Sequence, residues 1–452
     1  MTDGEITIGE ALSIAVEKQN AGDLRGAEVI YRKILDKYPD NADALHLIGL
    51  LAYQVGRYSE AIENIEKAIA VRPGVAVYLG NLGMAYDKLG KEEESVKCFM
   101  KAVEIDSRYN GAHWAYYNLG VYFKDRGEMG KALENYDKAI EIKRDFYDAR
   151  WNRSFILLLL GRYKEGWEDY ESRFLKESSV DSRRFRGDKW KGEPLEGKRI
   201  LIIAEQGFGD AIQFVRYLSL VKEKGGYVIL ECKKELRRLF ENGSLADEVI
   251  EKEKGIVDLE YDFYIHLMSL PRIFGTEVVF GRERYLKADR RDVEKFMEKF
   301  KGDRFRVGIC WAGNPEQEND KNRSMSFEKF EILKDISGVE LYSLQKGAGH
   351  SQFDDCCGII DMGKNAEDFA DTAAIIENLD LVISVDSSVA HLAGAMGKKV
   401  WTLLTFNPDW RWGVEGEDCL WYPTMRLFRQ KRAGDWDTLM GEVREKLEKV
   451  LK

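Results

Sequence analysis

A residue pattern with a period of 34 occupies the first third of the chain. Gly49 and Gly83 lie 34 residues apart, and similar apolar, small and aromatic residues surround both. A third unit surrounds Gly120 after a longer turn, and parts of the pattern surround Tyr31 and Tyr163. Small residues at fixed places are what paired helices need where they touch. We therefore predict a stack of helix pairs.

This period is typical of tetratricopeptide repeats, and we predict about five units over residues 8–175, within an array of residues 1–175. Such arrays leave a concave groove for a protein or peptide partner. Asn81, Asn118 and Asn152 occupy one repeat position. Because an amide donates and accepts hydrogen bonds, a ladder of these side chains would grip an extended peptide backbone. The alternative is that asparagine is simply common at this position.

Strands and helices alternate in the rest of the chain, which predicts doubly wound α/β structure. We place a polar connector at residues 176–197, one α/β domain at 198–300 and a second at 301–452, which ends in a closing helix. Two such domains in tandem form a cleft between the carboxyl ends of their strands. The predicted strands are 198–204, 227–231, 247–250, 261–266, 306–311, 339–344, 358–361, 381–385 and 399–404.

The segment 381–404 gives the clearest indication of a ligand site. Asp386, Ser387 and Ser388 lie where a buried strand ends and a short helix begins. The first turn of a helix has free N–H groups and a positive dipole end, so it suits a phosphate. His391 follows Ser388 by three residues and shares its helix face. The alternative is an ordinary strand–helix unit in which Ser387 only caps the helix.

A glycine loop follows the first strand of the first α/β domain. Gly207 and Gly209 allow close approach of the backbone, and Asp210 falls at a helix start. The loop is not the G-x-G-x-x-G dinucleotide motif, because residue 212 is Ile. In a cleft, Asp210 can act as general base for an acceptor hydroxyl. The alternative is that Asp210 is an N-cap.

Two further polar loops follow strands of the second α/β domain. The loop 311–324 carries Lys321 and Arg323, either of which can neutralise a leaving phosphate. Gln345 and Lys346 lie just past the next strand, where a nucleotide base or phosphate can rest. The alternatives are a solvated loop and a simple turn.

Several of these stretches resemble the glycosyltransferase family that contains the bacterial ADP-heptose:lipopolysaccharide heptosyltransferases. The resemblance covers residues 198–435 and rests on AEQGFGDAIQFVRY, WAGNPEQENDKNRS, SLQKG, ISVDSSVAHLAGAMGKKVWTLL and DWRWG. The coupling to repeats also resembles the O-linked N-acetylglucosamine transferases. The implied fold is an all-α tetratricopeptide superhelix followed by α/β GT-B, in which two Rossmann-like domains face a cleft. The acceptor side lies in the first of these domains and the nucleotide-sugar donor in the second.

The resemblance also implies a mechanism, which is inverting transfer from a nucleotide-sugar without a metal or other cofactor. It places the catalytic base on Asp210 and the diphosphate contacts on the Asp-Ser-Ser-x-x-His stretch. It leaves the choice between Lys321 and Arg323 open. The chain departs from the heptosyltransferases in its repeats and in its second loop, so ADP-heptose is not implied as its donor.

The predicted function is therefore an inverting glycosyltransferase whose acceptor hydroxyl belongs to a protein or peptide held by the repeats. The alternatives are transfer to a cell-surface glycan or lipopolysaccharide precursor, a nucleotide-sugar epimerase, and a non-catalytic scaffold with a degenerate nucleotide-sugar domain. Asp435-Trp-Asp437 resembles a metal-binding D-x-D motif, but we expect it to cap the last helix. We expect four bulky aromatic residues to pack between the α/β halves: Trp410, Trp412, Trp421 and Tyr422.

Composition excludes other classes of protein. The net charge of -10 argues against a nucleic-acid surface. The acidic start predicts no signal peptide, and no apolar run is long enough for a transmembrane segment. The six cysteines form no C-x-x-C pair, which favours reduced thiols and a cytoplasmic location. The oligomeric state stays open.

Overall fold

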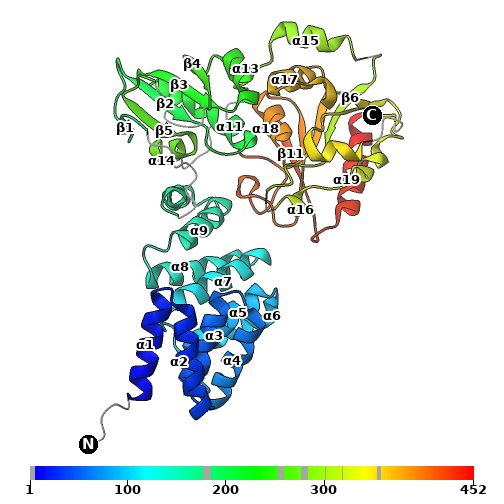
Figure 1. The fold of residues 1–452 in the computed structure, drawn as a ribbon. Helices are drawn as coiled ribbons and strands as arrows, with labels where there is room; N and C mark the ends of the chain where they lie inside the picture. Colours follow the sequence, from blue (N-terminus) through cyan, green and yellow to red (C-terminus); the bar gives the residue numbers. More distant parts are fainter. Residues whose placement is uncertain are drawn as a thin grey trace, which may run out of the picture. The chain divides into compact units, whose positions relative to one another are not determined.

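The computed structural model describes residues 6–176, 185–252, 259–275, 284–300, 302–317, 319–353 and 358–452. The chain divides into two compact units, Met1–Arg153 and Ser154–Lys452, and Figure 1 shows the elements of both. Residues 177–184 of the predicted connector lie outside the described residues. The predicted bounds of the array, the connector and the two α/β domains stay predictions.

The first unit consists of helix pairs, as the repeat pattern predicts. From Ile8–Asn20 to Met129–Ile142, each helix packs against the next one along the chain. A Cβ on Gly49 would lie 2.7 Å from Cγ1 of Ile65, and one on Gly120 would lie 2.5 Å from Cε1 of Tyr136. The recurring glycines are thus needed because the helices approach closely. The helices are α1 (Ile8–Asn20), α2 (Leu24–Lys37), α3 (Ala42–Gln54), α4 (Tyr58–Val71), α5 (Ala76–Lys88), α6 (Glu92–Ile105), α7 (Ala112–Asp125), α8 (Met129–Ile142) and the start of α9 (Tyr147–Leu159).

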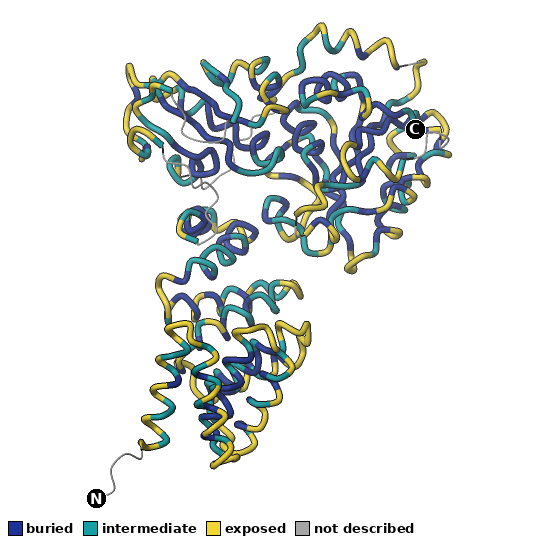
Figure 2. Tube along the Cα trace, in the orientation of Figure 1, coloured by how far each residue is buried: buried dark blue, intermediate teal, exposed yellow. Residues whose placement is uncertain are grey.

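The core of the first unit is a series of small clusters between neighbouring helices. Figure 2 shows buried residues between the helices and exposed ones at the turns. One cluster joins Leu45, Ile65 and Leu82, which come from three successive helices. Each helix pair therefore buries its apolar face only by stacking on the next pair.

The second unit begins with the end of α9, then α10 (Tyr163–Tyr170) and the 3-10 helix η1 (Glu171–Phe174). Its first sheet has five parallel strands in the order β1-β5-β2-β3-β4. Ile202 on the central strand pairs with Leu230 on one side and Ile265 on the other. The strands are β1 (Asp188–Lys189), β2 (Arg199–Ile203), β3 (Tyr227–Cys232), β4 (Glu248–Glu251) and β5 (Phe263–His266). The helices are α11 (Phe208–Phe214), α12 (Leu218–Lys222), α13 (Lys234–Gly243), α14 (Leu270–Ile273) and α15 (Arg290–Met297).

The second sheet has six parallel strands in the order β11-β10-β9-β6-β7-β8. The chain runs outward from β6 through β7 and β8, then returns to β9 on the other side of β6. The crevice between β6 and β9 is therefore the place where ligands bind in such sheets. The strands are β6 (Phe305–Cys310), β7 (Val339–Ser343), β8 (Ile360–Asp361), β9 (Leu381–Val385), β10 (Val400–Leu404) and β11 (Met425–Arg429). The helices are α16 (Asp320–Arg323), α17 (Phe369–Glu377), α18 (Ser388–Ala395) and α19 (Trp436–Val450).

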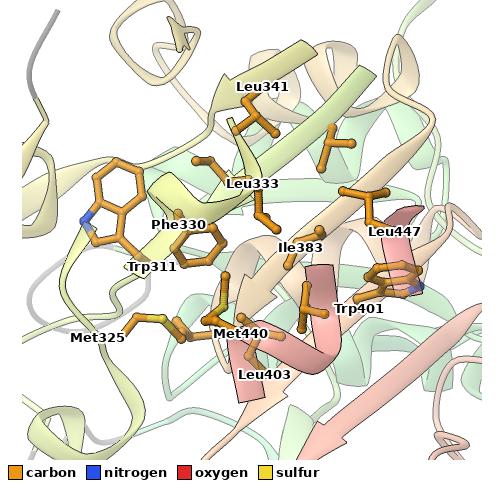
Figure 3. Packing of buried hydrophobic residues seen from close by; sticks show 14 of the residues in the cluster. Trp311, Met325, Phe330, Leu333, Leu341, Ile383, Trp401, Leu403, Met440 and Leu447 are labelled. Atoms are coloured by element: carbon orange, nitrogen blue, oxygen red, sulfur yellow. The ribbon is translucent and has the colours of Figure 1, made fainter. Parts of the chain in front are cut away.

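A large apolar core lies against the second sheet (Figure 3). The last helix, α19, packs with the 3-10 helix η4 (Phe327–Leu333) over strand side chains such as Ile383 and Leu403. Met440 and Leu447 of α19 are both buried in this cluster. Asp435 accepts a hydrogen bond from the N–H of Thr438 at 3.2 Å, so the D-x-D stretch caps α19 as predicted.

Three features of the α/β region differ from the sequence prediction. The sequence did not predict β1, which has two residues, or β11, an edge strand. β11 reads Met-Arg-Leu-Phe-Arg, where charged residues interrupt the apolar pattern expected of a buried parallel strand. The helical period of residues 211–224 predicts one helix, whereas the structure has α11, the 3-10 helix η2 (Val215–Tyr217) and α12 there. None of the described helices combines the length and apolar character needed to cross a membrane.

Candidate active site

A cavity of about 620 Å³ opens at the carboxyl ends of both sheets of the second unit. This volume falls within the range of small-molecule sites. Lys321 is exposed on α16, whereas Arg323 lines the cavity. The structure thus brings both predicted halves of the site together. The predicted residues that line the cavity are Gly207, Gly209, Asp210, Arg323, Gln345, Lys346, Asp386, Ser387, Ser388 and His391.

The helices α11 and α18 pack directly against each other at the floor of the site. A Cβ on Gly209 would lie 2.8 Å from Cδ2 of His391. His391 has little room to retreat, because its ring stacks on Trp412 with a centroid distance of 5.1 Å. Gly209 is therefore required for this helix contact.

We expect Gly209→Ala to destabilise the second unit by about 1–3 kcal/mol, because the added methyl overpacks this contact. The displacement of His391 should also weaken any ligand held at α18. Thermal unfolding with and without ligand measures both effects. The control is Gly441→Ala in α19, where a Cβ meets nothing within 4 Å. This control should be neutral or stabilise the helix, and equal losses in both variants would contradict the contact.

Ser387 is the N-cap of α18. Its Oγ accepts a hydrogen bond from the N–H of Val389 at 3.2 Å and lies 2.8 Å from the Oγ of Ser384. The capping alternative therefore describes this hydroxyl, and its contact with a diphosphate stays a prediction. Ser388 is half-buried at the first position of the helix and lines the cavity. Its hydroxyl and the N–H groups of the first turn suit an anion.

His391 is buried, and its Nδ1 lies 2.8 Å from the hydroxyl of Tyr422. Burial, followed by the charge of Arg411, holds the pKa of His391 well below its usual value. The imidazole is therefore neutral near pH 7. In the tautomer that accepts the Tyr422 hydrogen at Nδ1, the proton is on Nε2. Nε2 lies 3.9 Å from Oδ1 of Asp386, and that tautomer has a hydrogen-bond donor on this side of the ring.

The carboxyl groups of Asp386 and Asp409 are neighbours in the cavity lining beside α18. Burial and the neighbouring carboxylate of Asp409 raise the pKa of Asp386, while Arg323 opposes the increase. Arg323 itself donates from Nε to Oδ1 of Asp320 at 3.0 Å. The site therefore holds both acidic groups and a guanidinium. A charged ligand can replace an ion pair such as Arg323–Asp320 with contacts of its own.

Asp210, the predicted base, is hydrogen-bonded on both oxygens. Its Oδ2 accepts the N–H of Gly207 at 2.9 Å, and its Oδ1 is bound by a guanidinium nitrogen of Arg411. The N-cap of α11 is Gly207 and Asp210 is the third residue of the helix, so the N-cap alternative is wrong for Asp210, although its carboxylate binds the N–H of the N-cap residue. Arg411 was not predicted as a site residue, although it stands within the DWRWG stretch.

Gln345 and Lys346 both bond to backbone. The Gln345 Oε1 accepts from the N–H groups of Trp311 and Ala312 at 3.0 and 2.9 Å, and its Nε2 donates to backbone carbonyls. This amide holds the loops after β6 and β7 together. The Lys346 ammonium binds the carbonyl of Ala366 before α17. Contacts of both side chains with a nucleotide stay predictions.

One wall of the cavity comes from α9 and α10. Phe155 and Tyr170 line it, and the Tyr170 hydroxyl accepts from Nε2 of Gln206 at 2.8 Å. Trp167 on α10 packs on Phe214 with a centroid distance of 5.7 Å. This wall was not predicted from the sequence, because Tyr170 matched the repeat pattern. The four aromatic residues expected to pack between the halves are all buried: Trp410, Trp412, Trp421 and Tyr422.

The predicted asparagine ladder lies in the first unit, where each amide already donates within the unit. Asn81 donates to Nε2 of His46 at 2.9 Å, Asn118 to the carbonyl of Trp114 at 2.8 Å, and Asn152 to the hydroxyl of Tyr117 at 3.0 Å. A peptide bound by these side chains would have to use the amide atoms that are not engaged in these hydrogen bonds. Binding of a peptide by these three residues stays a prediction.

His46 makes the stability of the first unit depend on pH. Burial lowers its pKa to about 4 from 6.5. Because the unfolded chain binds the proton more tightly, the stabilisation is complete above pH 6.5 and is lost as pH falls towards 4. The loss should reach about 3 kcal/mol. Urea unfolding at pH 7 and pH 4 measures it, and His46→Gln should remove this part of the pH dependence. An unchanged dependence in His46→Gln would contradict the assignment.

No three His, Cys, Asp or Glu side chains are grouped as metal ligands in the part of the chain that the structure describes. The fold and the cavity together define a helical repeat protein with a two-sheet α/β region and a polar site suited to a charged ligand.

Comparisons with known proteins agree with this description. Tetratricopeptide-repeat profiles match residues 12–63, 76–109 and 113–146. The profile of glycosyltransferase family 9 (heptosyltransferase) matches residues 367–418, a range that includes α18 and Arg411. The chain therefore carries tetratricopeptide repeats and a glycosyltransferase family 9 domain, which supports glycosyltransferase activity.

Individual proteins share larger or smaller parts of the chain. Protein FlbA of Caulobacter vibrioides is 29% identical over 446 residues, which cover 90% of this chain and 72% of FlbA. The probable UDP-N-acetylglucosamine–peptide N-acetylglucosaminyltransferase SPINDLY of Hordeum vulgare is 33% identical over 108 residues, 22% of this chain and 11% of that protein. The crystal structure of MamA is 27% identical with a TM-score of 0.32, and covers 36% of this chain and 94% of MamA.

Proposed function

We propose that the chain is an inverting glycosyltransferase that moves a sugar from a nucleoside diphosphate to an acceptor hydroxyl. The observation that carries the proposal is the single cavity lining shared by the Gly207–Asp210 loop and the start of α18. One side offers a carboxylate that can accept a proton. The other offers a helix N-terminus, the His391 imidazole and the Arg323 guanidinium for a leaving diphosphate.

In the proposed reaction, the acceptor oxygen forms a bond to the anomeric carbon as the bond from that carbon to the diphosphate breaks. The proton of the acceptor hydroxyl passes to Asp210, and the electron pair of the broken bond leaves on the diphosphate. Arg323, Nε2 of His391 and the N–H groups of α18 stabilise that charge. These groups take the place that a metal ion fills in other transferases, so we propose transfer without a metal.

A thermal-shift panel tests the donor site. ADP, GDP, UDP and CDP are compared with their common sugar conjugates, and we expect one nucleotide series to raise the melting temperature. His391→Gln should lose most of the shift. The matched control is His350→Gln in the same half, because His350 binds Asp361 at 2.8 Å instead. If none of the nucleotides shifts the melting temperature of the wild-type chain, the proposed function is wrong.

The donor identified by the panel then tests the metal-independent mechanism. We expect turnover to be unchanged after treatment with EDTA. Loss of turnover that Mg²⁺ or Mn²⁺ restores would contradict this part of the proposal.

We propose a protein or peptide as the acceptor, because the repeats of the first unit are of a type that binds polypeptides. The relative SPINDLY is itself named as a peptide transferase. A library of Ser- and Thr-containing peptides is compared with oligosaccharides as acceptor, and mass spectrometry detects the added sugar. We expect transfer to peptides. Transfer to oligosaccharides alone would favour the glycan alternative.

A further inference from the structure

Arg411 connects the two halves of the candidate site. It lies in a 3-10 helix, η8 (Trp410–Trp412), and its side chain is only 9% exposed although it lines the cavity. Its Nη1 donates to Oδ1 of Asp409 at 2.7 Å and its Nε to Oε1 of Gln213 at 2.6 Å. Its Nη2 binds Oδ1 of Asp210. All three guanidinium nitrogens therefore contact side chains in the described structure.

These contacts restrict Asp210. One of its oxygens is fixed by the N–H of Gly207 at the start of α11. The other is bound by Arg411, so a hydroxyl that approaches to about 3 Å must compete with the guanidinium. Asp210 can serve as base most readily after Arg411 has moved to another anion.

The cavity provides a place for that anion. The charge of Arg411 contributes to the low pKa of His391, after burial, and opposes the raised pKa of Asp386. Arg411 thus contacts the proposed base and lines the same cavity as the proposed diphosphate site. A guanidinium binds phosphate oxygens with two parallel hydrogen bonds, a geometry that suits a diphosphate.

We propose that Arg411 is a ligand of the donor diphosphate, and that donor binding exchanges its contact with Asp210 for one with phosphate. The inference rests on the proposed function and assigns Arg411 a role within it. The base is then free only when the donor is in place, so the donor binds before the acceptor.

A double-mutant cycle on the full chain tests the exchange. The ligand is the nucleoside diphosphate found in the panel, and calorimetry gives its affinity for wild type, Arg411→Gln, Asp210→Asn and the double variant. Arg411→Gln should weaken binding by about 10- to 100-fold. Asp210→Asn should tighten it several-fold, because it weakens the contact that competes for Arg411. In the Arg411→Gln background, Asp210→Asn should have no effect.

The controls separate this role from general charge and from folding. Affinity for the corresponding nucleoside, which lacks phosphates, should not change in Arg411→Gln. Arg426→Gln, on β11, removes a charge whose partner Glu417 is exposed and should bind as the wild type does. Arg411→Lys keeps the charge and should weaken binding less than Arg411→Gln. Two results would overturn the inference. One is wild-type affinity in Arg411→Gln, and the other is tighter binding by Asp210→Asn that persists when Arg411→Gln is also present. Absence of nucleotide binding by the wild-type chain would instead refute the proposed function.

Discussion

Asp210→Asn is expected to lower turnover by about 100- to 10,000-fold, the usual contribution of a general base. The amide is nearly the same size as the carboxylate, and its oxygen can still accept the N–H of Gly207, a contact of 2.9 Å in the wild type. The start of α11 should therefore remain intact. Asparagine cannot take up the acceptor proton at neutral pH, so the chemical step should fail while nucleotide binding persists.

The rate of nucleoside diphosphate release from the identified donor, measured with and without acceptor, tests this expectation. Calorimetry on the same samples confirms that the nucleotide still binds. The matched control is Asp435→Asn, which removes a carboxylate that caps α19 away from the cavity. Wild-type turnover in Asp210→Asn would show that another group accepts the proton. Loss of nucleotide binding together with turnover would show a structural role.

The sequence predicted most of the fold because its strongest signals are local. The 34-residue period and the buried strands β2, β6 and β9 are visible within short windows. The bounds of β9 agree with the prediction at both ends. The missed strand β11 lies at a sheet edge, where pairing with β10 decides the structure and the residue pattern does not. Contacts between distant segments have no comparable local signal.

The site residues also divide into those with a local sequence signal and those whose contacts join distant segments. Gly209, Asp210 and His391 were found because loops and helix starts after strands meet at one edge of parallel sheets. Arg411 and Phe155 were missed because their contacts join segments far apart in the chain. The choice between Lys321 and Arg323 could not be made from the sequence. Residues two apart on a short helix face different directions, and only the three-dimensional structure shows which of them faces the cavity.

Arg173→Leu is expected to destabilise the attachment of α10 and η1 to the first sheet by about 3–5 kcal/mol, because it leaves a buried charge without its partner. The Arg173 Nη2 donates to Oε1 of Glu205 at 3.1 Å and to Oγ of Ser269 at 2.8 Å, and its Nη1 donates to Oε1 of Glu171 at 2.8 Å. The side chains of Arg173 and Glu205 are 1% and 0% exposed. Hydrogen exchange of residues 163–174 measures the local loss, and it should accelerate by about two to four orders of magnitude.

Two further variants decide whether the unpaired charge is the cause. Arg272→Leu removes a more exposed ion pair between α14 and α10, in which Arg272 lies 3.4 Å from Glu168, and it should cost less than about 1 kcal/mol. Arg173→Leu combined with Glu205→Leu removes both buried charges and should recover much of the stability, since an apolar pair can replace a buried ion pair. If the double variant exchanges as fast as Arg173→Leu, the loss comes from packing rather than charge.

Because α10 also carries Tyr170, whose hydroxyl binds Gln206, faster exchange in Arg173→Leu should be accompanied by lower turnover. The cavity wall formed by α10 would then depend on the attachment of α10 and η1 to the first sheet.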